Sequence, residues 1–280
     1  MVLGLLPGCS AVKLGYNNAP ELAYWWLDGY ADLTQAQSSR IREDLARLQQ
    51  WHRVAELPKV AELLQKTQQL ALANTTPEQV CGLFAEIRVR IDALLTQAEP
   101  AALALAMDLG AAQIAHIETK FGKTNTQWRE DWMEGSLAKR QARRLKTAVE
   151  RSEQFYGALE EHQLALLRNA IAQSEFDPPF SYAERLRRQQ DMLQTLRQTS
   201  AASGDARFSA TQSGAALRAY LERAVNSPNP AYRAYLDREI AFNCRTLARL
   251  HNSTTAEQRE RAARRLAAYE RDARELAAQR

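Results

Sequence analysis

The sequence is poor in the residues that interrupt helices or start strands. It holds 11 Gly and 9 Pro among 280 residues, and runs of β-branched residues are almost absent. Ala, Leu, Arg, Gln and Glu, all good helix formers, dominate instead. Strands therefore have little sequence from which to grow, and we expect an all-α protein.

Short motifs of common enzyme and metal sites are also missing. The four histidines are scattered, with no His-Glu-x-x-His and no Glu-x-x-His. There is no Gly-rich phosphate loop and no Gly-x-Ser-x-Gly. We therefore predict a protein without enzymatic activity, metal or cofactor.

Charge of one sign is in slight excess, since Lys and Arg total 37 against 33 Asp and Glu, for a net charge of +4. Such a surface suits anionic lipid headgroups or acidic proteins. A possible basic binding face is formed by Arg140, Arg143, Arg144 and Arg151, which fall near one side of a helix. The alternative is a solvated face paired with acidic residues one turn away.

Past the first residues, no stretch approaches the ~20 apolar residues of a membrane span. The amino terminus is apolar and ends in Leu6-Pro7-Gly8-Cys9, which resembles the lipobox of bacterial lipoproteins. This resemblance implies that residues 1–8 are a residual signal peptide and that Cys9 carries a lipid. Pro7 is unusual there and the charged front of a signal peptide is missing, so we expect the true start upstream of Met1. The alternative is a short apolar segment with a buried Cys9.

Only two cysteines remain, Cys81 and Cys244. They could pair in an oxidising periplasm, which would bring the two portions of the chain together. The alternative is two buried free thiols. Nucleic acid is not an expected partner of an exported protein.

The chain divides into a lipid anchor and aromatic tether over 9–31 and a single all-helical domain over 32–280. The aromatic cluster of the tether either lies at the membrane interface or covers the helical body. We expect an elongated multi-helix bundle with one long helix near 123–173, whose apolar residues are spaced alternately by four and three. Other helices are predicted over 33–57, 58–73, 76–97, 100–107, 109–121, 231–250 and 255–278, with a loop at 199–214.

Thr-x-x-Gln recurs where helices are expected to start. A threonine at the N-cap accepts from the third amide, while the glutamine reaches back to the N-cap amide, forming a capping box. Leu109-Gly110-Ala111-Ala112-Gln113 is a degenerate copy. The three full copies are Thr34 with Gln37, Thr76 with Gln79, and Thr255 with Gln258.

These motifs, and above all the stretch from Thr254 to Leu266, resemble the Spy/CpxP family of periplasmic stress proteins. That resemblance implies an all-helical cradle that binds unfolded clients or a sensor kinase. Nearly the whole chain resembles an uncharacterised family of proteobacterial lipoproteins. This second resemblance rests on Cys9-Ser10 and on the stretches 14–17, 22–30, 51–53, 128–131 and 250–252, and it implies a localisation rather than an activity.

We therefore expect a lipid-anchored cell-envelope protein, at the outer membrane facing the periplasm. Its function is expected to be chaperone-like or stress-related binding of unfolded or envelope proteins. The alternative is a structural or assembly scaffold with one dedicated partner. The sequence does not indicate the oligomeric state.

Overall fold

The computed structural model describes residues 11–200 and 210–279, and twelve helices make up almost all of that part. The predicted all-α fold class is confirmed. Cys9 and the centre of the predicted 199–214 loop lie outside the described residues. The helices are α1 (Ala11–Asn17), α2 (Ala19–Ala31), α3 (Gln35–Ala55), α4 (Leu57–Ala71), α5 (Pro77–Asp108), α6 (Ala111–Trp132), α7 (Leu137–Tyr156), α8 (Glu161–Gln173), α9 (Pro178–Thr199), α10 (Ala210–Val225), α11 (Pro230–Asn252) and α12 (Ala256–Ala278).

The prediction of a single long helix near 123–173 is wrong, because the chain turns twice in that interval. α6 stops before Gly135, whose φ of +88° ends a helix readily, and Ser136 caps the start of α7. α7 ends at Gly157, with φ of +75°. A Cβ there would lie 2.9 Å from the Arg261 guanidinium, so glycine is required on two counts. The apolar spacing continues across the second turn, which hides the break.

A proline fails to break α5. The expected helices 76–97 and 100–107 are one helix that runs through Pro100. The α6 helix likewise extends beyond the predicted 109–121, to Trp132. Proline removes one backbone hydrogen bond and disfavours a helix interior, but the surrounding contacts outweigh that cost here.

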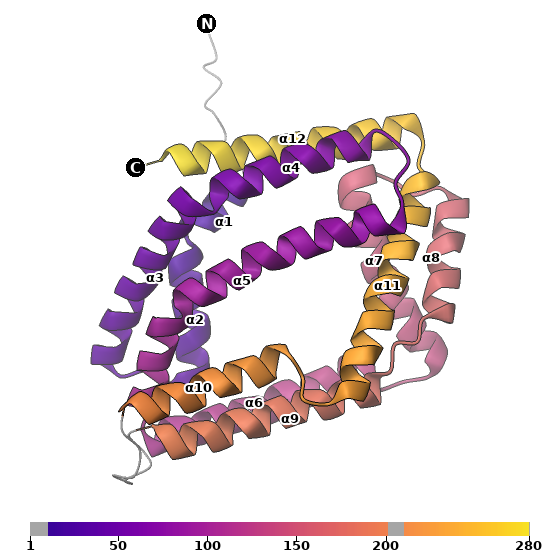
Figure 1. Cartoon of the computed structure of the whole chain (residues 1–280). Helices are drawn as coiled ribbons and strands as arrows, with labels where there is room; N and C mark the ends of the chain where they lie inside the picture. The colour runs from indigo at the N-terminus through magenta and orange to yellow at the C-terminus, as the bar shows by residue number, and fades with distance from the viewer. Residues whose placement is uncertain (1–10, 201–209, 280) are drawn as a thin grey trace, which may run out of the picture.

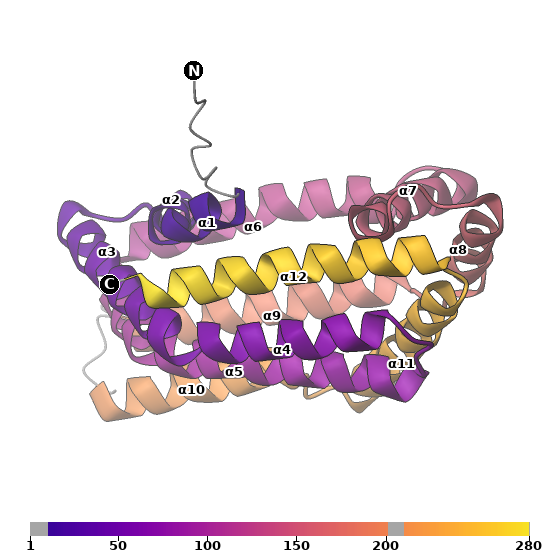
Figure 2. The same cartoon turned by 90° about the horizontal axis from the view of Figure 1, so that it is seen from above.

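The helices form a four-sided ring (Figures 1 and 2). One edge holds α4 and α12, which run side by side. The next holds α2 and α3, the edge opposite α12 holds α6, α9 and α10, and the last holds α7, α8 and α11. α5 runs obliquely across the ring opening from the α11 edge to the α3 edge, on the side of the ring where α4 and α10 lie (Figures 1 and 2).

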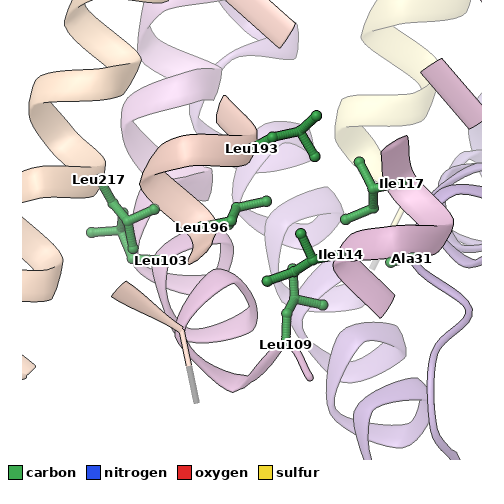
Figure 3. Packing of buried hydrophobic residues seen from close by; sticks show 8 residues of the cluster. All are labelled: Ala31, Leu103, Leu109, Ile114, Ile117, Leu193, Leu196 and Leu217. Atoms are coloured by element: carbon green, nitrogen blue, oxygen red, sulfur yellow. The ribbon is translucent and has the colours of Figure 1, made fainter. Parts of the chain in front are cut away.

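Buried apolar residues gather in three separate clusters on the frame of this ring. The largest joins α2, α5, α6, α9 and α10 at one corner (Figure 3). A second lies between α4 and α12, and a third joins α8 and α11 to α7. The hydrophobic core is therefore distributed along the edges and corners.

Two diagonal corners are held by pairs of glutamines. At the first, the side-chain oxygens of Gln37 and Gln113 each accept a hydrogen bond from the backbone amide of their own N-cap residue, at 3.0 and 2.9 Å. The Gln37 amide donates to Asp108 O at the end of the other helix pair, and the Gln113 amide donates to Asp32 O. The two side chains also donate to each other. Each glutamine therefore caps the start of its own helix and the end of a helix from the other pair.

The second corner repeats this arrangement with Gln163 and Gln258. Their side-chain oxygens accept from the Glu160 and Thr255 amides, and the two amides exchange hydrogen bonds of 2.7 and 3.0 Å. The Gln163 amide donates to Ser253 O, and the Gln258 amide to Ala158 O. Relative to each glutamine, the accepting carbonyls occupy the same positions as at the first corner.

Helix contacts extend this correspondence to both halves of the chain. The contacts of α2 with α3 and α6 match those of α7 with α8 and α12. The contact of α3 with α5 matches that of α8 with α11, and α4 on α12 matches α9 on α6. The ring is therefore built from two related halves, α2–α6 and α7–α12, in which α10 has no counterpart.

A disulfide links these halves. Cys81 in α5 and Cys244 in α11 are bonded, with their Cα atoms 5.5 Å apart, so the predicted pairing is confirmed.

No single described helix is both long and apolar enough to cross a membrane, although α5 and α6, bent by 112°, meet that requirement as a pair.

Candidate functional site

A cavity of about 1090 Å³ opens into the ring interior between the α6–α9 edge and the α7–α8–α11 edge. Its walls come from α6 to α11, and Phe84 is contributed by α5. Nine aromatic side chains line it: Phe84, Phe121, Trp128, Trp132, Phe176, Tyr220, Tyr232, Tyr235 and Phe242. Apolar, aromatic clefts with a few polar groups are typical of ligand sites.

Aromatic side chains pack against one another along the α6–α9 wall of the cavity. Trp128 stacks on Tyr182 with ring centroids 5.3 Å apart, and Trp132 meets Phe176 edge-on at 5.6 Å. The Asn125 amide donates to Gln189 at 2.7 Å between the same two helices. These large side chains keep the helices apart while remaining paired with one another.

Four arginines stand among the aromatic residues: Arg144 and Arg151 from α7, and Arg185 and Arg188 from α9. Arg188 donates to the buried Glu184 at 2.9 Å, and Arg187 binds the same carboxylate. Burial acts to raise the pKa of Glu184, but these guanidiniums outweigh it and the pKa lies below its ordinary value. Glu184 therefore remains charged and neutralises Arg188.

Glu239 is the second carboxyl group of the cavity, and its surroundings differ. Burial raises its pKa, against the attraction of Arg144. Its Oε1 is buried and has no hydrogen-bond partner among the described residues. Burial and Arg144 therefore act on the Glu239 carboxyl group in opposite directions, and both residues line the same cavity.

A stripe of exposed apolar residues on α5 continues the lining into the rest of the interior. Phe84, Ile87, Ile91 and Leu95 follow one helix side, with exposed fractions of 38%, 45%, 47% and 52%. The opposite side of α5 is held by Arg90, which donates to Glu56 at 3.1 Å, and by the Glu86–Lys66 ion pair with α4. The stripe therefore lies on a side of α5 turned away from α4, and Phe84 at its start lines the cavity.

The predicted basic face is divided by the structure. Arg140 donates to Gly135 O at 2.8 Å and Arg143 to Glu134 O at 2.8 Å, so both stabilise the turn before α7. Arg144 and Arg151 line the cavity instead. The helical spacing alone could not separate these roles, because it does not show which neighbour each side chain meets.

The predicted Thr-x-x-Gln motifs also serve two different roles in the structure. Thr34, Thr76 and Thr255 all cap their helices with Gln37, Gln79 and Gln258. The box of Thr76 and Gln79 is exposed and serves as a cap, whereas the other two take part in the corners. Sequence reasoning missed Gln163 by treating it as an interruption of an apolar seam. Its signal was Leu159-Glu160-Glu161-His162-Gln163, the same spacing with glutamate at the N-cap.

Two residues just before the second corner bind the loop between α4 and α5. Asn252 exchanges two hydrogen bonds with the Thr75 backbone, at 2.8 and 2.9 Å. Nε2 of His251 donates to Ala73 O at 2.8 Å, so its Nδ1 accepts from the Tyr156 hydroxyl at 3.0 Å. Burial lowers the pKa of His251, and burial raises the pKa of Tyr156 to about 12. Both are neutral near pH 7.

The aromatic cluster at 16–30 is only partly core. Tyr24 is buried and donates to Ser38, but Trp25 and Trp26 are 61% and 63% exposed. The interpretation of this cluster as core therefore fails for the two tryptophans. Among the described residues, no group of three or more His, Cys, Asp or Glu side chains is arranged to hold a metal ion.

Comparison with protein families gives one match. The model of a family of unknown function, DUF6279, matches residues 29–209, more than half of the chain and all of α3 to α9. No curated protein and no solved structure matches the chain.

Proposed function

This chain belongs to the DUF6279 family, and we propose that it is a non-enzymatic cell-envelope protein that holds apolar segments of unfolded or envelope proteins inside its ring. The observation that carries this proposal is the character of the interior. Phe84 belongs both to the aromatic cavity and to the exposed stripe of α5, while the buried core clusters lie at the edges and corners.

Burial of apolar surface supplies the driving force. Each side chain of the stripe exposes about half of its surface, and covering apolar surface contributes roughly 25 cal/mol per Å². A monomer rarely leaves such a contiguous surface exposed without a partner. An extended client segment laid along α5 would cover it and reach the aromatic cavity past Phe84.

The compartment is proposed from two features. The disulfide suits an oxidising environment outside the cytosol. Cys9 in its lipobox-like context, only two residues before α1, would tether the ring to a membrane. We propose the outer membrane, facing the periplasm, because Ser10 rather than Asp follows the cysteine.

An aggregation-protection assay tests the chaperone-like activity. The Cys9→Ser chain would be mixed at equal concentration with each of two unrelated unfolding proteins, and light scattering followed. We expect suppression with both. Ile91→Glu should abolish it, because a charge then stands within the stripe. Val89→Glu is the matched control, since Val89 is 52% exposed on another side of the same helix.

Two results would contradict the proposal. Equal protection by the two variants would show that the stripe is not the binding surface. Lack of protection of either protein, combined with capture of one stable partner by cross-linking in cells, would support a dedicated scaffold instead.

A further inference from the structure

Three of the four cavity arginines have no carboxylate partner. Arg188 is paired with Glu184, but Arg144, Arg151 and Arg185 form no ion pair within 4.0 Å to any carboxylate of the described residues. Elsewhere on the ring, arginines such as Arg223 and Arg238 are paired at 2.6 and 3.0 Å. Arg144 and Arg151 lie on α7 and Arg185 on α9, so guanidiniums without an ion pair face the cavity from two of its walls.

Neutral groups hold two of these guanidiniums in place. Arg185 donates to Asn125 Oδ1 at 2.7 Å and to Thr124 Oγ1 at 3.1 Å. Arg144 donates to Ser174 Oγ at 2.8 Å and lies 4.9 Å from the centroid of the Phe176 ring. These contacts fix the direction of each side chain through neutral partners. Glu239 attracts Arg144 but forms no ion pair with it within 4.0 Å. Oriented cations in a partly apolar site favour anionic ligands.

The positions of the arginines indicate more than one anionic group. Arg144 and Arg151 are seven residues apart on α7, about 10 Å along the helix axis. Arg185 belongs to α9 on another wall of the cavity. One carboxylate head on an acyl chain cannot reach all three. A polypeptide with an acidic side chain on every second or third residue can reach all three.

We propose that the cavity selects acidic, aromatic stretches of polypeptide, in which Asp or Glu alternates with aromatic or apolar residues, and that Arg144, Arg151 and Arg185 bind their carboxylates. This inference rests on the proposed function and adds the composition of the bound segment. Aromatic side chains of the client pack against the Trp128 and Trp132 wall, and its acidic side chains reach the three guanidiniums.

Binding of three matched peptides to the full Cys9→Ser chain tests this inference. The peptides carry a dye and share the same aromatic residues, which alternate with Glu, Gln or Lys. Fluorescence anisotropy gives the Kd of each. We expect the Glu peptide to bind about tenfold more tightly than the Gln peptide, as the sum of a few modest ion pairs. The Lys peptide should bind most weakly, and added salt should remove the preference.

A charge reversal on α7 locates the selectivity. Arg151→Glu should weaken binding of the Glu peptide several-fold and leave the Gln peptide unchanged. Lys146→Glu makes the same charge change on the same helix, but Lys146 is 77% exposed and lies outside the cavity. This control should bind all three peptides as the parent chain does. Both positions are exposed, so neither variant is expected to unfold the ring.

The outcomes separate this inference from the proposed function. Equal affinity for all three peptides would overturn the acidic preference and leave client binding standing. Absence of binding by all three would overturn both. Displacement of the Glu peptide by decanoate at stoichiometric concentration would show that a single-headed fatty acid satisfies the site, and would overturn the assignment to polypeptide.

Discussion

Two corresponding edges of the ring pack in opposite ways. On the α4–α12 edge, small residues allow close approach: Ala61 and Ala262 are 0% and 3% exposed, and Leu276 is 1% exposed. On the α6–α9 edge, Trp128, Trp132 and their aromatic partners fill the contact, and a cavity opens beside them. One edge is closely packed and the related edge borders a cavity.

The comparison shows that two related halves can differ in packing through the size of their side chains. Both corners keep the same glutamine arrangement, so the frame is the same on both sides. The alanines of one edge and the tryptophans of the other then decide where the ring is closed. Predictions that disturb one half and compare it with the other test this division.

Breaking the link between the halves should have the largest effect. The disulfide joins α5 of one half to α11 of the other across 163 residues of sequence. Its removal by Cys81→Ala with Cys244→Ala is expected to lower the free energy of unfolding by up to roughly 5 kcal/mol on the chain-entropy model. Urea denaturation of both chains measures the change. An unchanged midpoint would contradict the structural role of this bond.

Removing one glutamine from each corner tests whether the halves are equivalent. Gln113→Ala leaves the Gly110 amide and Asp32 O without a partner, and Gln163→Ala leaves the Glu160 amide without one while Ser253 O keeps its hydrogen bond with His162, so each should cost about 2 to 3 kcal/mol. Gln79→Ala, in the exposed box, should cost about 1 kcal/mol. Unequal losses at the two corners would argue against the correspondence.

Enlarging one residue of the α4–α12 edge and one residue of the cavity wall compares their packing. Ala61→Leu forces extra carbon atoms into a fully buried contact and should cost about 2 kcal/mol. Thr147→Leu adds a similar side chain to the α7 wall of the cavity, where space is available, and should change stability by no more than about 0.5 kcal/mol. Thermal unfolding of both variants gives the comparison. Similar losses would mean that the cavity wall is packed as tightly as the α4–α12 edge.

Acid should loosen the second corner more than the first. His251 lies there, whereas the matching position at the first corner is Ala106. The pKa of His251 is lowered by burial, so the unfolded chain takes up the proton first as the pH falls below about 6.5, and stability decreases. Burial acts on His52 in the same direction, but on the α3 edge.

A variant series isolates this contribution. The His251→Gln chain should lose less stability than the parent between about pH 7.5 and pH 5. His116→Gln, which changes an exposed histidine, should follow the parent. Hydrogen exchange at both pH values reports each corner separately. Parallel pH profiles for all three chains would show that His251 does not contribute.

Local signals in the sequence predicted much of the helical structure. Thr34 and Thr255 lie where the helix starts were placed, because a capping box depends on four consecutive residues. Partners could not be predicted, since Gln163 and Gln258 are 95 residues apart and each also satisfies its own helix. The break at Gly157 was hidden by an apolar period that continues across it. Trp128 and Trp132 share the four-residue spacing of core residues, so only the neighbouring helices show that they line a cavity.

The disulfide closes residues 81–244 into a covalent loop and leaves the two terminal segments of the chain outside it. Nearly all residues that line the cavity lie between Cys81 and Cys244, whereas α4 and α12 lie wholly outside this interval. A pulling force applied to the two ends of the chain can therefore peel the α4–α12 edge apart, after which the load crosses the sulfur–sulfur bond. The cavity walls carry none of that tension. A ring under mechanical load at its two ends would yield at the α4–α12 edge and keep its cavity intact.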